Sequence, residues 1–203
     1  MFEKNPESIE EKSFKIIGKE LEADGVFLDE KEESIIKRVI HTTADFEYAK
    51  LLKFHDKAIE NGLNAIKRGE KIYCDTRMIQ YGLVSKRIGC ELVNYVHDED
   101  VYKMAKEKGI TRSMAAIEKA VDEDIKVFAI GNAPTALYKI KEYIELGKLN
   151  PDLIIAVPVG FVGAAESKEE IMNMDVPYIA TKGRKGGSPI AVAIINALFK
   201  KLK

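Results

Sequence analysis

The sequence is poor in residues that mark several large classes of protein. Its 203 residues include two cysteines, three histidines and no tryptophan, and its acidic and basic residues nearly cancel to a net charge of −1. Because there is no excess of positive charge, we expect no nucleic-acid partner. Cys74 and Cys90 lack the C-x-x-C spacing of zinc and redox sites. We therefore expect two buried thiols in a reducing cytoplasm and no bound metal.

Long hydrophobic segments are also absent. The longest apolar run, residues 153–165, is interrupted by Pro158, Gly160 and Gly163, and it is too short to cross a bilayer. The polar beginning of the chain lacks the apolar region of an export signal. We therefore expect a cytoplasmic protein with no membrane partner.

The short motifs of common cofactor and hydrolase chemistry are missing as well. The glycine-rich stretch 183–189 does not have the spacing of a P-loop, and no G-x-G-x-x-G follows the first predicted strand. There is no G-x-S-x-G elbow and no H-E-x-x-H metal pair. The sequence therefore predicts neither a nucleotide cofactor nor a catalytic metal.

What the chain does have is a regular alternation of strand and helix patterns from residue 72 onward. Five apolar segments are predicted strands: residues 72–74, 91–96, 126–130, 153–157 and 178–181. Amphipathic segments between them predict helices on both faces of a parallel, doubly wound sheet in a three-layer α/β/α arrangement. Residues 8–21 and 29–41 are predicted helices that form an N-terminal arm, and residues 46–54 are not assigned. We expect one domain over residues 1–203.

Small, polar and cationic residues follow the predicted strands. Asp75 and Thr76 follow the first, residues 131–135 follow the third, and a loop with Arg184 follows the fifth. Ligands of doubly wound sheets bind beyond the carboxyl ends of the strands, and helix N-termini there favour anions. A polyanion is therefore the expected ligand. Ordinary turn roles for the glycines, and a helix-capping role for Asp75, remain alternatives.

Residues 38–45, Arg-Val-Ile-His-Thr-Thr-Ala-Asp, form a compact polar cluster at the end of a predicted helix. His41 is the candidate catalyst, because an imidazole can donate and recover a proton near neutral pH. A capping role at the helix C-terminus is the alternative for His41. Arg112 lies in the first turn of another predicted helix, where the helix dipole disfavours a cation, and that misfit favours a functional role.

Several stretches along almost the whole chain resemble the precorrin-8X methylmutase family of cobalamin biosynthesis, whose members are also described as cobalt-precorrin-8 methylmutases. The matching stretches are residues 38–46, 75–78, 131–137, 158–168 and 183–189. The resemblance implies a flavodoxin-like sheet and a homodimer that binds a tetrapyrrole between its subunits. It also implies an isomerase that moves a methyl group from ring carbon 11 to carbon 12, without an added methyl donor.

The same resemblance implies a role for individual residues. His41 matches the active-site histidine, which donates a proton or a hydrogen bond to a ring nitrogen. Ser13, Arg38, Thr76 and Arg112 match, or lie near, positions associated with substrate contacts. The substrate carries many carboxylates, for which these cations and Arg184 are suitable partners.

Apolar contacts to the macrocycle are expected from Phe161, Met78 and the segment around Phe46, although core packing is the alternative for each. Two other functions remain open at this point. One is a corrinoid carrier without turnover, although the D-x-H-x-x-G motif that coordinates cobalt in such modules is absent. The other is an enzyme for a phosphate-bearing ligand on the same fold, which rests on the glycine loops alone.

Overall fold

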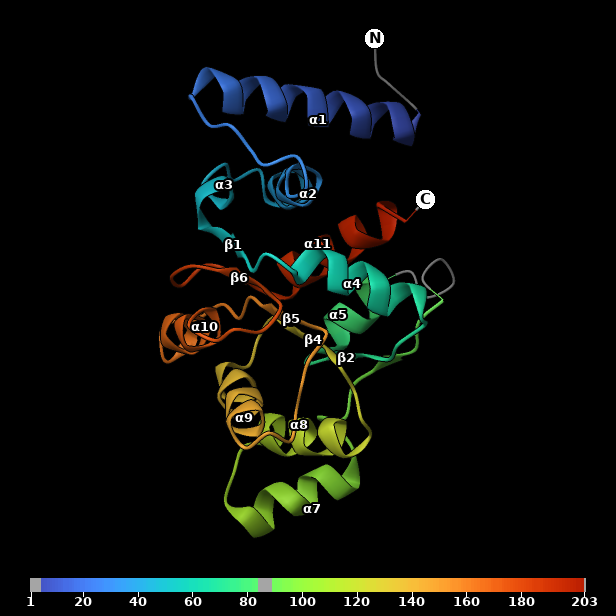
Figure 1. The fold of residues 1–203 in the computed structure, drawn as a ribbon, viewed down its shortest axis with the longest axis vertical. Coiled ribbons are helices and arrows are strands. Elements are labelled where there is room, and N and C mark those ends of the chain that lie inside the picture. The colour runs from blue at the N-terminus through green and yellow to red at the C-terminus, as the bar shows by residue number, and fades with distance from the viewer. Residues whose placement is uncertain (1–4, 84–88, 203) are drawn as a thin grey trace.

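The computed structural model describes residues 5–83 and 89–202, and its centre is a six-stranded sheet with helices on both faces (Figure 1). The strands run in the order β1-β6-β5-β4-β2-β3. Their bounds are β1 (Leu52–Phe54), β2 (Ile72–Cys74), β3 (Leu92–Val93), β4 (Val127–Ile130), β5 (Leu153–Ala156) and β6 (Tyr178–Thr181). Strands β2 to β6 are parallel to one another and have the strand order of flavodoxin-like sheets, which confirms the predicted fold class.

The prediction of five strands was one short. Strand β1 lies at the edge of the sheet, antiparallel to β6, within the segment that the sequence left unassigned. It has only three residues, of which Leu52 alone is buried, so no periodicity marks it. The predicted strand over residues 91–96 is also shorter than expected, because only Leu92 and Val93 pair with β2.

One face of the sheet is covered by α4 (Ala58–Lys67), α5 (Arg77–Gly82) and α11 (Ser188–Lys200). Helix α11 is apolar almost all round, because α2 (Glu33–Thr43) packs on it from the side away from the sheet. Helix α1 (Pro6–Ala23) then packs on α2 as the outermost element of the arm (Figure 1). The short α3 (Tyr48–Leu51) leads from the arm into β1.

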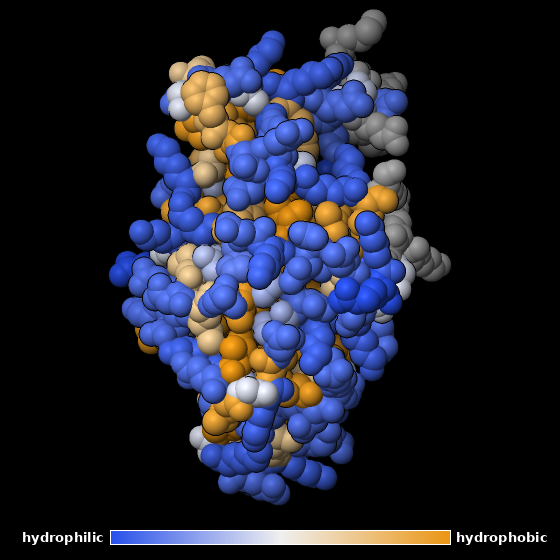
Figure 2. Space-filling view, in the orientation of Figure 1, coloured by the Kyte–Doolittle hydropathy of each residue, from blue (hydrophilic) through white to orange (hydrophobic). Residues whose placement is uncertain are grey.

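The opposite face is covered by α8 (Arg112–Asp122), α9 (Pro134–Glu145) and α10 (Ala164–Met172), and α7 (Glu99–Lys108) packs against α8 (Figure 1). Each face has its own buried apolar cluster, separated by the sheet. The side of the molecule seen in Figure 2 is mostly hydrophilic, with hydrophobic residues in separate patches between charged ones. No helix in the described ranges is long and apolar enough to cross a membrane.

Some helix ends differ from the prediction because local hydrogen bonds decide them. Helix α2 begins at Glu33 and not at Asp29, whose carboxylate accepts a hydrogen bond from the Lys31 N–H (2.8 Å) in a turn before the helix. Helix α4 starts at Ala58 without a side-chain cap, although Asp56 precedes it. Thr111 does cap α8 as its sequence position suggests, since its hydroxyl accepts from the Met114 N–H (3.2 Å).

Candidate functional site

The parallel strands end together, so the loops that follow them share one edge of the sheet. In the register, Cys74 lies beside Ala129, Ile130 beside Ala156, and Ala156 beside Ala180. The loops after β2, β4, β5 and β6 are therefore neighbours. We call this side the carboxyl edge. It contains all three predicted ligand loops, those after β2, β4 and β6, as a doubly wound sheet requires.

Asp75 organises the centre of the carboxyl edge, next to the point where the strand order reverses. Its buried carboxylate accepts hydrogen bonds from the backbone N–H groups of Gly131 (3.0 Å), Asn132 (2.8 Å) and Ala133 (2.8 Å). Burial raises the pKa of this carboxyl, and the three N–H donors counteract the rise. Asp75 is therefore not a helix cap, and these N–H groups are not free to bind a ligand phosphate.

Thr76 connects β2 to the loop that follows β6. Its hydroxyl caps α5 by accepting from the Ile79 N–H (3.2 Å), and it also hydrogen-bonds to the Ser188 hydroxyl (2.8 Å). Ser188 is the first residue of α11. The predicted contact residue Thr76 is thus joined directly to the loop that carries Arg184.

That loop, residues 182–187, is packed closely against the end of β5. The Gly187 N–H donates to the Val157 carbonyl oxygen (2.7 Å), and a Cβ on Gly186 would clash with the same oxygen. Gly131 is equally constrained, because a Cβ there would lie 2.8 Å from the Ser188 Cα. Gly131 and Gly186 are therefore explained by close main-chain approach, which is neither the predicted ligand binding nor the ordinary turn role that was its alternative.

Lys185 ties this loop to the segment that follows His41. Its ammonium pairs with the carboxylates of Asp45 (2.5 Å) and Glu47 (2.6 Å). The hydrogen bond from Lys185 lowers the pKa of Asp45, and the two carboxylates raise the pKa of Lys185. No sequence pattern predicts this link, because its partners are far apart along the chain.

His41 lies in the last turn of α2 and is exposed. Its ring meets the Phe14 ring edge-on, with centroids 5.9 Å apart. The helix end is capped by other groups: the Ala44 N–H bonds to the Ile40 carbonyl, and the Thr42 hydroxyl donates to the Arg38 carbonyl. Within the described ranges nothing hydrogen-bonds to the imidazole, so both ring nitrogens are open to a ligand.

Arg38, which lies near the same aromatic ring, and Ser13 on α1 already have partners. The Arg38 guanidinium lies over the Phe14 ring (5.0 Å to the centroid) and donates to the Glu10 carboxylate (2.6 Å). Burial opposes ionisation of Glu10, but hydrogen bonds from Lys200 and Arg38 lower its pKa overall. The Ser13 hydroxyl donates to the Ile9 carbonyl of its own helix (2.8 Å).

Arg184 and Arg112 are exposed cations on the carboxyl edge, and neither has an ion-pair partner in the part of the chain that the structure describes. Arg184 lies over the ring of Phe161 (5.5 Å to the centroid), which is 82% exposed. Arg112 starts α8, whose cap Thr111 donates to the Thr135 hydroxyl (3.1 Å) at the start of α9. No contact joins Arg112 to His41 within one chain.

Lys168 was not among the predicted site residues, although it lies in one of the matching stretches. It is fully buried on α10, and its ammonium donates to the Lys185 carbonyl (2.8 Å) beneath the loop. Its neighbours in the sequence include Glu166, Glu169 and Glu170, so no local pattern predicts that Lys168 is buried.

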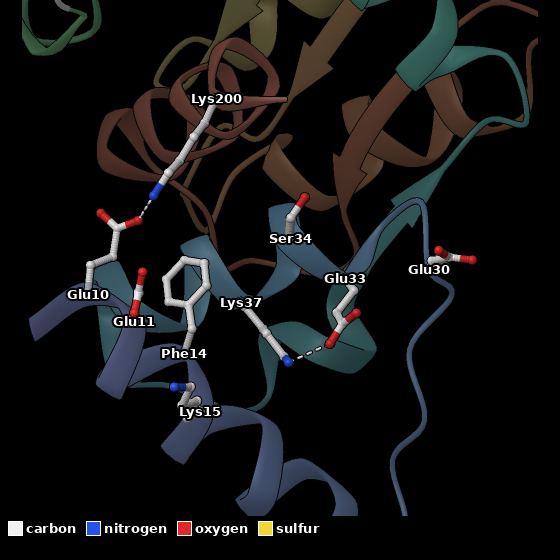
Figure 3. Close-up of a pocket in the computed structure, with 9 residues that line it drawn as sticks. All are labelled: Glu10, Glu11, Phe14, Lys15, Glu30, Glu33, Ser34, Lys37 and Lys200. Atoms are coloured by element: carbon white, nitrogen blue, oxygen red, sulfur yellow. Dashed lines mark hydrogen bonds and ion pairs between the residues drawn. The ribbon is translucent and has the colours of Figure 1, made fainter. Parts of the chain in front are cut away.

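A groove of about 390 Å³ lies between α1 and α2, and Phe14, whose ring meets His41, is part of its lining (Figure 3). Its lining includes the carboxylates of Glu10, Glu11, Glu30 and Glu33 against three lysines. Such a lining is unsuited to a ligand with many carboxylates. Among the described residues, no three His, Cys, Asp or Glu side chains come together as metal ligands.

The chain was compared with known proteins. The family model described as precorrin-8X methylmutase matches residues 8–201. The cobalt-precorrin-8 methylmutase of Leptospira interrogans is 44% identical, over 95% of this chain and 92% of its own length. The precorrin-8X methylmutase of Pseudomonas aeruginosa is 38% identical, over 95% of this chain and 94% of its own length.

The fold agrees with these matches. A crystal structure of precorrin-8X methylmutase from Thermus thermophilus superimposes with a TM-score of 0.87 at 39% identity, covering 96% of this chain and 95% of that one. The chain therefore belongs to the precorrin-8X methylmutase family, and it is an enzyme of the isomerase class.

Proposed function

We propose that this enzyme moves a methyl group from ring carbon 11 to carbon 12 of a precorrin-8-type tetrapyrrole, either precorrin-8X or its cobalt form. The product is then hydrogenobyrinate or cobyrinate. The methyl group stays within the molecule, so the reaction needs neither an added methyl donor nor a redox partner. His41 assists it by donating a proton or a hydrogen bond to a ring nitrogen.

The observation that carries this proposal is the position of His41. Its imidazole is exposed and has no hydrogen bond to any described residue, and the Lys185 ion pairs connect the segment after it to the loop that bears Arg184. These ion pairs therefore link the segment after a proton donor to a loop whose cation is suited to a polycarboxylate. We propose that Arg184 and Arg112 bind substrate carboxylates directly, whereas Arg38 must first exchange its bond to Glu10.

Ser13 and Thr76 have smaller proposed roles. Each hydroxyl is engaged within the chain, Ser13 with the Ile9 carbonyl and Thr76 with Ser188. A hydroxyl retains acceptor capacity after donating one hydrogen bond. We propose that both contact the substrate with that remaining capacity.

We also propose that residues 1–203 act as one domain and form a homodimer with the site between subunits. Phe161 and Val162 follow β5 at the carboxyl edge and are 82% and 90% exposed, although both are apolar. A second subunit or the macrocycle would cover them.

Sedimentation velocity is expected to show a dimer that Val162→Asp weakens. Leu146→Asp, beyond the far end of α9, should leave the dimer intact. A monomer in both variants and in the unmodified chain would contradict the dimer.

The decisive experiment removes the imidazole and follows the absorbance change of a precorrin-8-type substrate. His41→Ala is expected to lower turnover about 100-fold or more, the usual scale of a general acid. Product affinity and thermal stability should remain, because the side chain is exposed and makes no hydrogen bond to the described residues. His97→Ala, which alters an exposed histidine before α7, is the matched control and should keep full activity.

Two results would overturn the proposal in different ways. Full turnover by His41→Ala would remove His41 from the mechanism. Tight product binding by the unmodified chain without any methyl shift would identify a corrinoid carrier.

A further inference from the structure

Lys168 is a buried lysine whose ammonium faces no carboxylate. It is 0% exposed, and its Nζ donates to the Thr181 hydroxyl (3.1 Å) and to the Lys185 carbonyl (2.8 Å). No described acidic residue lies within ion-pair distance of it. Burying an amine without a counter-ion is costly. Because this burial is costly, we expect the Lys168 amine to have a role that a neutral apolar side chain could not fill.

Comparison with Lys139 shows that the arrangement is unusual within this molecule. Lys139 is also nearly buried, but it pairs with the carboxylates of Glu118 (3.0 Å) and Glu142 (3.1 Å). Burial alone lowers the pKa of Lys168 to about 8, whereas ion pairing raises the pKa of Lys139 against its own burial. The surroundings of Lys139 are those of a structural ion pair. The Lys168 ammonium instead holds a main-chain carbonyl by a hydrogen bond.

The anchored group is the main chain of the loop at residues 184–187. The Lys185 carbonyl accepts from Lys168 and also from the Thr181 hydroxyl (2.8 Å). On either side of it, the Arg184 carbonyl accepts from the Gly160 N–H (3.1 Å), and the Gly187 N–H donates to Val157 (2.7 Å). The loop is thus held from below along its whole length.

The upper side of the same loop carries the charged groups of the candidate site. The Arg184 side chain extends over Phe161, and the Lys185 side chain reaches Asp45 and Glu47 in the segment after His41. A shift of the Lys185 main chain would move both side chains. The position of Lys168 therefore affects both the place of the Arg184 side chain and the ion pairs that join Lys185 to the segment after His41.

We propose that Lys168 is a positioning residue for substrate binding, which holds the Lys185 main chain so that Arg184 and the Lys185–Asp45 pair keep their places. It acts through the loop and does not touch the substrate. The inference rests on the proposed function of the site, because it assigns Arg184 to the substrate carboxylates.

The test replaces the amine while keeping an unbranched side chain of similar length. Lys168→Met is expected to raise KM about tenfold, the scale of one lost charge-assisted hydrogen bond, with kcat changed much less. Thr181→Val, which removes the other donor to the Lys185 carbonyl, should raise KM in the same direction. Lys141→Met is the matched control, since it loses only partly exposed ion pairs with Glu145 and with Glu170 of α10 and should leave KM unchanged.

A double-mutant cycle separates positioning from packing. If Lys168 acts through the loop that carries Arg184, combining Lys168→Met with Arg184→Gln should raise KM little more than the worse single variant. Additive effects, or an unchanged KM in Lys168→Met, would assign Lys168 to packing and overturn the proposal.

Hydrogen exchange gives a readout that needs no substrate. The Gly187 amide, bonded to Val157, should exchange faster in Lys168→Met than in the Lys141→Met control. Unchanged exchange would show that the loop is held without Lys168. Failure of the proposed function is recognised separately, because it would appear as absent turnover in the unmodified enzyme or full turnover in His41→Ala.

Discussion

The carboxyl edge of the sheet and the α1–α2 arm contribute to the same candidate site but are built differently. At the edge, Asp75 and Lys168 are buried, and their bonds go to main-chain atoms of the loops. In the arm, His41 is exposed and unbonded among the described residues, and Arg38 holds Glu10 at the surface. Buried bonds to the main chain fix loop geometry, while an exposed side chain remains free to meet a ligand. The proposed catalyst, His41, thus lies in the arm, where its exposed side chain remains free to meet a ligand.

The largest expected effect on stability comes from removing the buried Asp75 carboxylate at the centre of the carboxyl edge. Asp75→Ala leaves three backbone N–H groups without their acceptor, so we expect a loss of about 3–5 kcal/mol in the free energy of unfolding. Denaturant unfolding measures this loss directly. Asp100→Ala removes an exposed carboxylate of α7 that pairs with Lys119 of α8. Its unfolding curve should overlay that of the unmodified chain. If the two variants behave alike, the edge is not held as we describe.

A smaller effect on stability is expected from adding one methyl group to a glycine of the carboxyl edge and, separately, to a glycine of the α1–α2 arm. Gly186→Ala would press a Cβ against the Val157 carbonyl, and we expect a cost of about 3 kcal/mol. Gly25→Ala, after α1, has a positive φ of 71° but open space around it, so only the backbone cost of about 1 kcal/mol applies. Equal losses of stability in the two variants would remove the distinction between a packed edge and a looser arm.

The smallest expected effect is a pH dependence of stability that belongs to Lys168. Burial lowers its pKa in the folded chain from 10.5 to about 8. Between these values the unfolded chain binds one proton more than the folded chain at this residue, so its contribution to stability increases as the pH rises.

The unmodified chain should therefore gain stability relative to Lys168→Met, by about 1 kcal/mol between about pH 8 and pH 9. Unfolding curves of both proteins at the two pH values give the difference, in which shared titrations cancel. A difference that is constant or shrinks with pH would show that the amine is not held in the surroundings described above.

Much of the architecture follows from local sequence patterns. Alternating apolar segments and amphipathic helices predicted the parallel sheet, its two helical layers and the helical arm, and the fold class and family are confirmed. Strand β1 was missed because three residues at a sheet edge carry no period, and its pairing with β6 depends on a partner far along the chain. Glycine positions in the loops were correctly noticed, but for Gly131 and Gly186 the reason is close main-chain packing.

The sequence by itself determined most of the elements, the family and the choice of His41 as the candidate catalyst, because residue type and spacing along a helix or strand are local properties. Only the tertiary structure decided that Asp75 binds the loop after β4, that Lys185 bridges to Asp45, and that Lys168 is buried beneath the same loop. These partners are separated by long stretches of chain, and their hydrogen bonds exist only once the strands have aligned their carboxyl ends. Burial then gives the bonds their strength, since a polar group removed from water must keep the partner that the fold supplies.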